Sequence, residues 1–384
     1  MFAPWLRATA FVIAAAALAA CNSGSASPPS LNTGRAVSFA LKQLVPLANL
    51  PPGGKFTYDI GIVDPATHHY YLADRTNASL DIVDTQSFAV TYVHDGFTGQ
   101  KPSNDNSGPD GVVFVPGGNV YVGDVNTVKV ITPSGTPVTT ITTGTAGLRT
   151  DEGCYDRDDN LIMFANPADS PPYATWISPA TNTVKTKYTF TGSSGLEACI
   201  YDPTTKNFLI NNDGTAANPH GELDVISAAS VVAGTPTVSA AYPEGNCNPA
   251  GLDLGPGDNL VVGCDAPAGD PQITLIMNAA TGNIVATITQ VGGEDEVAYD
   301  PFSNRYYTAS RDMTANGTSS TGAPGATFTP VLGVISASTN TWIENLPTGA
   351  GSHSVAVDPT NGNVYVPVPP TATTGGGIDI FGFQ

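Results

Sequence analysis

Along most of the chain, apolar residues come in short runs that are separated by turn-forming residues. Seven segments share one pattern, in which an acidic or polar residue precedes a short apolar strand, a tight turn and a second strand. The turns carry Asp-Pro, Pro-Gly or clusters of Asp and Asn, which supply the fixed φ of proline and the positive φ that glycine and asparagine tolerate. The seven segments begin at Asp59, Asp110, Asp151, Glu197, Pro249, Asp295 and His353.

Each of these hairpins is followed by a further apolar run, for example at 79–84 and 128–131. Several segments then reach a fourth run, such as 138–141 or 284–288. Four short strands per unit, repeated at a period of roughly forty to sixty residues, are typical of a β-propeller. We therefore expect an all-β fold, a seven-bladed β-propeller of four-stranded blades.

The two ends of the repeat region predict how the ring closes. The last segment ends at 378–381 after three strands, with no residues left for a fourth. Residues 40–54, before the first segment, match 341–351, the outer strand before the last one. An N-terminal strand that completes the final blade would remove an exposed sheet edge. We expect residues 36–384 to form this one domain.

The amino-acid sequence of the repeats resembles that of a known family. The stretches YYLADRTNASLDIVDT and NVYVGDVNTVKVIT are similar to the YVTN repeat of bacterial seven-bladed propellers. The resemblance covers residues from about 36 to 384, is good in the first, second and fifth segments, and is loose in the third and sixth. It implies a propeller in the cell envelope, but no single activity, because related propellers include lactonases, lyases and binding scaffolds.

The first twenty residues are typical of an export signal. Arg7 is followed by an almost unbroken apolar run, from Ala8 to Ala20, that is too short for a comfortable membrane span. The run ends in Leu18-Ala19-Ala20-Cys21, which resembles the bacterial lipobox and implies a lipid on Cys21; the alternative is an ordinary secretory signal that is cleaved elsewhere. Residues 21–35 are then a flexible tether to the membrane. Asn22 favours the outer membrane, on either its periplasmic or its outer surface.

Charge narrows the possible partners. Removing residues 1–20 takes away one Arg and no acid, so 13 basic and 33 acidic residues remain, a net charge of −20. A negative charge of this size repels other polyanions, so it argues against binding to nucleic acid and against electrostatic attachment to anionic lipid. It favours cationic ligands, or simply solubility outside the cell. We expect a monomer.

Four cysteines remain after Cys21, and an even number in an oxidising compartment indicates disulfides. Cys247 precedes the first strand of the fifth segment and Cys264 ends the second, so they become neighbours in an antiparallel hairpin. Cys154 and Cys199 occupy equivalent positions in consecutive segments, where they would join neighbouring blades or remain buried thiols.

The starts of the inner strands carry the candidate chemistry. In a propeller these positions meet at one mouth of the central channel, and five of the seven are carboxylates: Asp59, Asp110, Asp151, Glu197 and Asp295, with Glu152 and Glu296 one residue further in. Converging carboxylates repel one another unless they are protonated or neutralised, and Ca²⁺ with its oxygen ligands suits such a ring. The alternative is a wide, wet mouth with solvated acids. His353 is either a general base or polar lining.

Two functions compete on this sequence. The insertions at 95–108, 213–221 and 312–330 fall on the same face, where they serve recognition or have simply drifted. The first function is a lipid-anchored binding or scaffold module that holds a small-molecule ligand or an envelope protein. The second is a metal-dependent hydrolase that resembles the seven-bladed lactonases or the gluconolactonases, in which calcium polarises a carbonyl. Those calcium sites often use asparagines, and this ring has none. A lyase or a redox propeller remains open.

The lipid anchor predicts the outcome of one substitution. Cys21→Ser removes the thiol that would receive the lipid, so the protein should no longer incorporate labelled fatty acid and should leave the membrane fraction. Labelling in cells with Cys247→Ser as the matched control checks this. Equal labelling of the wild type and Cys21→Ser would contradict the anchor.

Overall fold

The structure, a computed structural model, describes residues 38–265, 272–311, 313–318 and 330–384. The predicted signal peptide (1–20), Cys21 and the tether (21–35) lie outside the described residues, as does most of the insertion at 312–330. No helix in these ranges combines the length and the apolar character that a membrane span needs.

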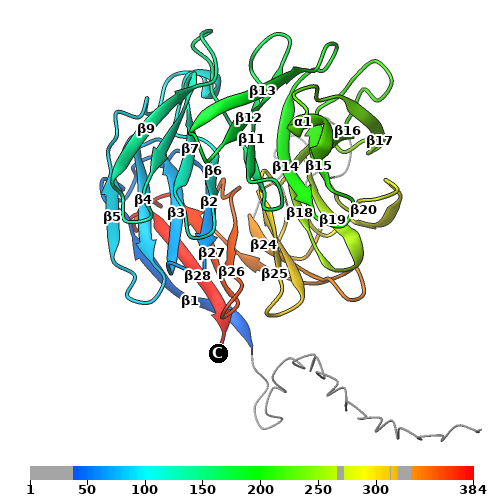
Figure 1. Cartoon of the computed structure of the whole chain (residues 1–384). Helices are drawn as coiled ribbons and strands as arrows, with labels where there is room; N and C mark the ends of the chain where they lie inside the picture. Colours follow the sequence, from blue (N-terminus) through cyan, green and yellow to red (C-terminus); the bar gives the residue numbers. More distant parts are fainter. Residues whose placement is uncertain (1–37, 266–271, 312, 319–329) are drawn as a thin grey trace, which may run out of the picture. The chain divides into compact units, whose positions relative to one another are not determined.

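Seven antiparallel sheets of four strands each follow one another around a central axis (Figure 1). The first four blades take their strands consecutively from the chain. These are β2 (Tyr58–Asp64), β3 (His69–Asp74), β4 (Ser79–Asp84), β5 (Val90–Val93); β6 (Val112–Phe114), β7 (Val120–Asp124), β8 (Thr127–Ile131), β9 (Pro137–Thr142); β10 (Gly153–Asp156), β11 (Leu161–Asn166), β12 (Tyr173–Ser178), β13 (Thr183–Thr189); and β14 (Leu196–Asp202), β15 (Asn207–Asn212), β16 (Glu222–Ser227), β17 (Val238–Pro243).

The last three blades complete the ring. Their strands are β18 (Pro249–Leu254), β19 (Asn259–Cys264), β20 (Thr274–Asn278), β21 (Ile284–Ile288); β22 (Val297–Asp300), β23 (Arg305–Ser310), β24 (Val331–Ser336), β25 (Thr341–Pro347); and β26 (Ala356–Asp358), β27 (Asn363–Val368), β28 (Gly377–Phe383) with β1 (Phe39–Pro46). β1 pairs with β28, from Phe39 opposite Phe383 to Pro46 opposite Gly377. The predicted seven blades and the closure by an N-terminal strand are both confirmed.

Burial explains why the strands of one blade differ in sequence. The second strand, such as β11, is buried along its whole length because it packs against both neighbouring blades. The outermost strand alternates between exposed and half-buried positions, as in β13 and β17. A strand covered on both faces is a continuous apolar run, whereas a half-covered strand alternates.

Short helical segments and two disulfides complete the domain. Helix α1 (Ala228–Val232) lies between β16 and β17, and the single turns η1 (Asn104–Asn106) and η2 (Pro256–Asp258) lie in loops. One disulfide joins Cys154 on β10 to Cys199 on β14, in neighbouring blades. The other joins Cys247 to Cys264 at the end of β19. Both pairs are those that the sequence indicates.

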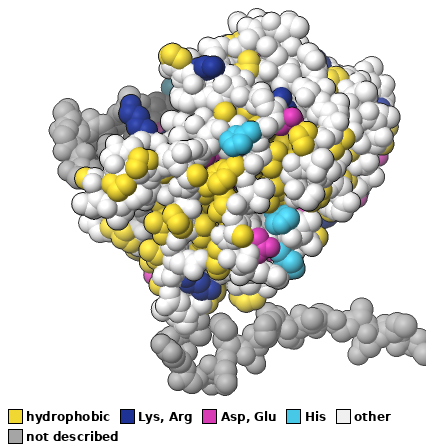
Figure 2. Space-filling model, turned by 90° about the vertical axis from the view of Figure 1, so that its left-hand side faces the viewer, with side chains coloured by type: hydrophobic (Ala, Val, Ile, Leu, Met, Phe, Trp, Pro, Cys, Tyr) yellow, Lys and Arg dark blue, Asp and Glu magenta, His cyan; other side chains and the backbone are white. Residues whose placement is uncertain are grey.

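One side of the ring carries little charge. Figure 2 shows the side where β5 and β9 are outermost, and hydrophobic side chains gather across its middle with few charged ones among them. Charged residues make up only 12% of the chain, so a local concentration of them elsewhere is informative.

The closing strand predicts a measurable difference between two of its residues. Phe39 is buried and stacks on Tyr307 with ring centroids 5.1 Å apart, whereas Leu41 on the same strand is 47% exposed. Phe39→Ala should lower the free energy of unfolding by about 3–5 kcal/mol. Leu41→Ala should change it by less than about 0.5 kcal/mol. Urea unfolding of both variants checks this, and equal losses would mean that β1 is not firmly packed.

Candidate functional site at the channel mouth

A pocket of about 300 Å³ opens at the axis, where the inner strands begin. It gathers most of the predicted inner ring, namely Asp59, Asp151, Glu197, Asp295 and His353. Asp110 is fully buried beside the pocket, where it binds Arg75, and Pro249 is buried and does not line it. The strand starts therefore converge as the sequence indicates, while the roles assigned to these residues stay predictions.

Three arginines form ion pairs with acids of this ring, and two of them, Arg75 and Arg311, also join neighbouring blades. Arg75 follows β3 in the first blade, and its Nη2 donates to Asp59 Oδ2 at 2.7 Å. Its Nε donates to Asp110 Oδ1, in the second blade, at 3.0 Å. Arg149 lies 2.9 Å from Asp151. Arg311 lies 2.7 Å from Asp295 and 3.3 Å from Asp265, which belongs to the preceding blade.

The metal hypothesis can be tested against this geometry. Among the described residues, carboxylate oxygens of Asp59, Asp110 and Asp151 lie within 4.8 Å of one another. However, all three carboxylates already bind a guanidinium. Ca²⁺ needs six to eight oxygen ligands, and here the cationic charge is already supplied by the protein. The arrangement does not fit a calcium ion.

The other two predicted ligands are held apart from this triad. Asp295 forms its ion pair with Arg311 on the sixth blade. Glu197 has Asp213 as its strongest charged neighbour. The structure therefore does not gather the five predicted carboxylates around one common point, as the sequence suggested.

Burial and charge act in opposite directions on these acids. Burial raises the pKa of Asp110 well above its usual range, and the Arg75 guanidinium opposes that rise only in part. Burial likewise raises the pKa of Asp151 to about 7 against the effect of Arg149. Burial also acts on Asp295, but there Arg311 and His353 prevail and hold its pKa below the usual value. The mouth thus contains firmly ionised and easily protonated carboxyls side by side.

His353 is held in one orientation. Its Nδ1 lies 2.7 Å from the carbonyl oxygen of Gly351, to which it donates, and its ring stacks on Tyr58 at 4.5 Å. Nε2 is left facing Asp295 at 3.9 Å, beyond hydrogen-bond distance. Burial lowers the pKa of His353, although Asp295 opposes this shift. The imidazole is therefore neutral at pH 7, with Nε2 able to accept a proton.

The sequence interpretation missed Arg75 and Arg149. Three of the seven arginines in the chain lie at this mouth, which is a signal that counting acids alone overlooks. Arg149 also depends on a distant loop, because its backbone N–H donates to the carbonyl of Asp105 at 2.8 Å. Asp105 belongs to the insertion 95–108, so this insertion helps to build the site.

A second pocket of about 350 Å³ adjoins the mouth and shares Arg149 and Glu197 with it. Its other walls are polar and include Ser194, as well as Asp105 and Asp213 from the insertions. Burial raises the pKa of Asp213 to about 6, and Arg149 opposes this. Together the two pockets form a polar groove with more carboxyls than guanidinium groups.

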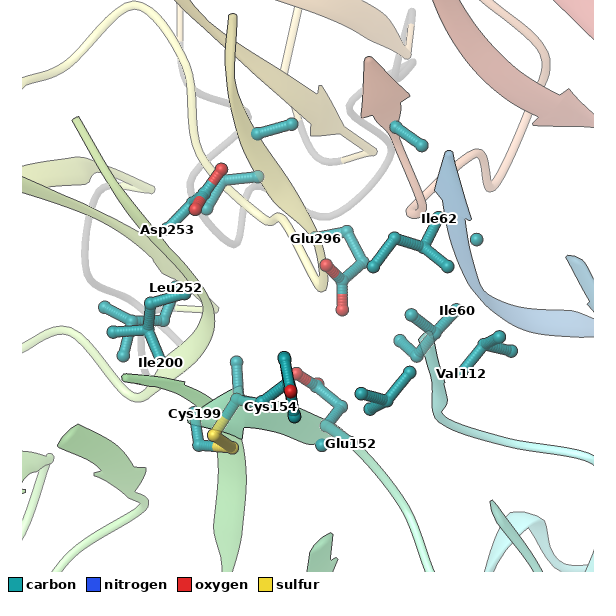
Figure 3. A pocket seen from close by; sticks show the side chains of 18 of the residues that line it. Ile60, Ile62, Val112, Glu152, Cys154, Cys199, Ile200, Leu252, Asp253 and Glu296 are labelled. Atoms are coloured by element: carbon teal, nitrogen blue, oxygen red, sulfur yellow. A yellow bond between two sulfur atoms is a disulfide. The ribbon is translucent and has the colours of Figure 1, made fainter. Parts of the chain in front are cut away.

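Below the mouth, the channel changes character. A cavity of about 290 Å³ is lined mostly by apolar side chains of the inner strands (Figure 3). Glu152 lines both this cavity and the mouth, so the two spaces adjoin. The Cys154–Cys199 disulfide forms part of its wall.

Comparisons with known proteins support the fold alone. No family model and no curated protein sequence matches this chain. The chain is similar to a chain of the Kuenenia stuttgartiensis hydrazine synthase structure, with TM-score 0.64 and 15% identity over 83% of this chain and 93% of that one. It is also similar to a chain of a mitotic checkpoint complex (TM-score 0.63, 12% identity, 97% and 98% covered) and to the WD40 propeller domain of Doa1 (0.61, 10%, 90% and 97%). These likenesses show a β-propeller and carry no activity.

The arginine pairs predict how the mouth responds to a lost charge. Arg75→Met leaves Asp59 and Asp110 buried without their cation, which should cost about 3–5 kcal/mol of unfolding free energy at pH 7. Because three carboxylates then converge with one cation fewer, Ca²⁺ should restore part of this loss while leaving the wild type unchanged. Urea unfolding with and without Ca²⁺ checks this.

The control for this experiment is Arg157→Met, which removes an exposed arginine. It should change the unfolding free energy by less than about 0.5 kcal/mol. Equal effects of the two substitutions, or stabilisation of the wild type by Ca²⁺, would contradict the assigned role of Arg75.

Proposed function

We propose that this protein is a lipid-anchored binding module of the cell envelope that holds a ligand at the mouth of its propeller channel. The observation that carries the proposal is the mouth itself, where charged side chains from different blades are fixed by ion pairs around a pocket of about 300 Å³. Fixed charges in a concave site bind a ligand without losing further side-chain freedom. Cys21 and the residues after it supply the attachment to the outer membrane.

The charge balance indicates the kind of ligand. Asp59, Asp110, Asp151 and Asp295 all have an arginine partner, whereas Glu197 and Asp213 form no ion pair within the described part of the chain. Burial raises the pKa of both carboxyls, which lie in the groove that links the mouth to the adjoining pocket, so a cation that enters the groove favours their ionised form. A small organic cation, or a basic group of an envelope protein, supplies the positive charge that these two carboxyls lack.

The second candidate is the hydrolase. One observation favours it, since the neutral His353 presents Nε2 to the pocket and can act as a general base. The calcium ion that would polarise a carbonyl does not fit the arginine-paired carboxylates. Binding is therefore the better supported function.

A binding panel tests the proposal. Melting curves of the full-length protein in mild detergent are recorded with methylammonium, acetate, phosphate, glucose and calcium chloride at equal ionic strength. Methylammonium should raise the melting temperature, by an amount equivalent to about 2.7 kcal/mol at a hundredfold excess over its Kd. Acetate and phosphate should have no such effect, because the groove has a surplus of carboxyls.

Two variants locate this binding. Glu197→Gln removes a mouth carboxyl and should weaken the stabilisation by methylammonium about tenfold in apparent Kd, a loss of one charged contact. Glu344→Gln makes the same chemical change on the outer strand β25 and should leave it unchanged. Equal stabilisation by anions and cations, or equal behaviour of the two variants, would rule out the cationic ligand.

A further inference from the structure

Two glutamates face each other in the channel below the mouth. Glu152 and Glu296 directly follow the ring residues Asp151 and Asp295, in the third and sixth blades. Two blades separate these on one side of the ring and three on the other, so the side chains come from opposite walls. Figure 3 shows both carboxyl groups directed into the channel toward each other.

No basic side chain accompanies this pair. The described residues that line the cavity include no Lys, Arg or His. Glu152 is only 7% exposed, and among the described residues no N–H or O–H donor other than the facing carboxyl reaches its side chain. Glu296 Oε1 is buried and has no hydrogen-bond partner within the same part of the chain. The third acid of the cavity, Asp253, differs, because its oxygens accept from the backbone N–H groups of Leu254 and Tyr299, both at 2.7 Å.

Two facing carboxyls in an apolar wall cannot both be ionised without a compensating cation. In the absence of one, burial raises the pKa of both groups. The charge of Glu296 raises the pKa of Glu152 further. The charges of Asp295, Asp59 and Asp253 raise the pKa of Glu296, although a hydrogen bond with Glu152 opposes this. The pair therefore holds a proton that a cation can replace. The arginines of the mouth form their ion pairs with other acids, namely Asp59, Asp110, Asp151 and Asp295.

The wall around the pair determines which cation fits. Ile60, Val112, Ile200 and Leu252 surround it with aliphatic surface (Figure 3). A calcium or magnesium ion would need several further oxygen ligands that this wall does not offer. An aliphatic chain, in contrast, gains from leaving water for such a wall.

We propose that the channel binds a primary alkylammonium, with its nitrogen between Glu152 and Glu296 and its aliphatic chain along the wall formed by Ile60, Val112, Ile200 and Leu252. This inference rests on the proposed function, because the ligand enters through the mouth that Glu152 also lines. The ammonium group has three N–H donors, enough to reach both carboxylates, and its charge replaces the shared proton.

A chain-length series tests this inference. Binding of methyl-, butyl- and hexylammonium to the full-length protein is measured by calorimetry at constant ionic strength. Affinity should rise by about three- to fourfold per added methylene group, as expected for burial of aliphatic surface. Butanol, which has the chain without the charge, should not bind.

The carboxyl pair is tested by Glu152→Gln combined with Glu296→Gln. This double variant should bind hexylammonium at least tenfold more weakly, while Glu344→Gln on β25 should bind it like the wild type. Its melting temperature at pH 7 should not fall, because the change removes groups that are unfavourable when ionised and buried. A normal melt thus separates lost binding from lost folding.

Acidification gives an independent readout. The pKa of each member of the pair is raised, so protons fill it at a higher pH than an ordinary glutamate, and hexylammonium should bind more weakly as the pH falls. This loss should be smaller in the double variant. The charged and titratable groups that act on the pair from the surrounding strands are Asp59, Asp151, Glu197, Asp253 and Asp295.

The outcomes separate this inference from the proposed function. If methylammonium binds and Glu197→Gln weakens it, but chain length and the double substitution have no effect, the mouth binds cations and the channel inference is overturned. If no organic cation binds the wild type at all, both are overturned. Chain-length dependence that survives in the double variant would also overturn the role of the pair.

Discussion

Mutual repulsion among acids at the axis is the constraint on which this structure depends. Ring closure brings the starts of seven inner strands together, and most of those starts are carboxylates. Carboxylate oxygens of Asp59, Asp110 and Asp151 lie within 4.8 Å of one another, and ionised carboxylates this close together in a buried site repel strongly. Arg75 and Arg149 make the convergence tolerable, because each supplies a positive charge at hydrogen-bond distance.

The same ion pairs also join the blades. Arg75 connects the first blade to Asp110 in the second, and Arg311 connects the sixth to Asp265 of the fifth. The disulfide between Cys154 and Cys199 joins the third and fourth blades covalently. The same ion pairs therefore neutralise the acids of the mouth and join the blades. A substitution that removes one of them should lower the unfolding free energy of the whole propeller.

The sequence was a better guide to the fold than to the site, and the reason is physical. Blade number follows from local signals, since each hairpin carries its own turn residues and apolar runs. The positions of Asp59, Asp151, Glu197, Asp295 and His353 follow from topology, because strand starts meet at one mouth. The ion pairs follow from neither, as the placement of Arg149 needs the insertion 95–108 to fold over it. Calcium was therefore suggested by counting acids without the cations that accompany them.

The identities of Glu152 and Glu296, the two facing acids of the channel, are not determined by the fold. The positions equivalent to Glu152 and Glu296 in the other blades are Ile60, Gly111, Ala198, Ala250 and Ser354. All five are uncharged, so the propeller closes well without an acid at this level of the axis. A buried carboxyl pair without a basic partner lowers stability, because each ionised group loses its water. Since neither the strand pairing nor the closure needs these two acids, their presence is better explained by something that enters the channel than by the architecture around it.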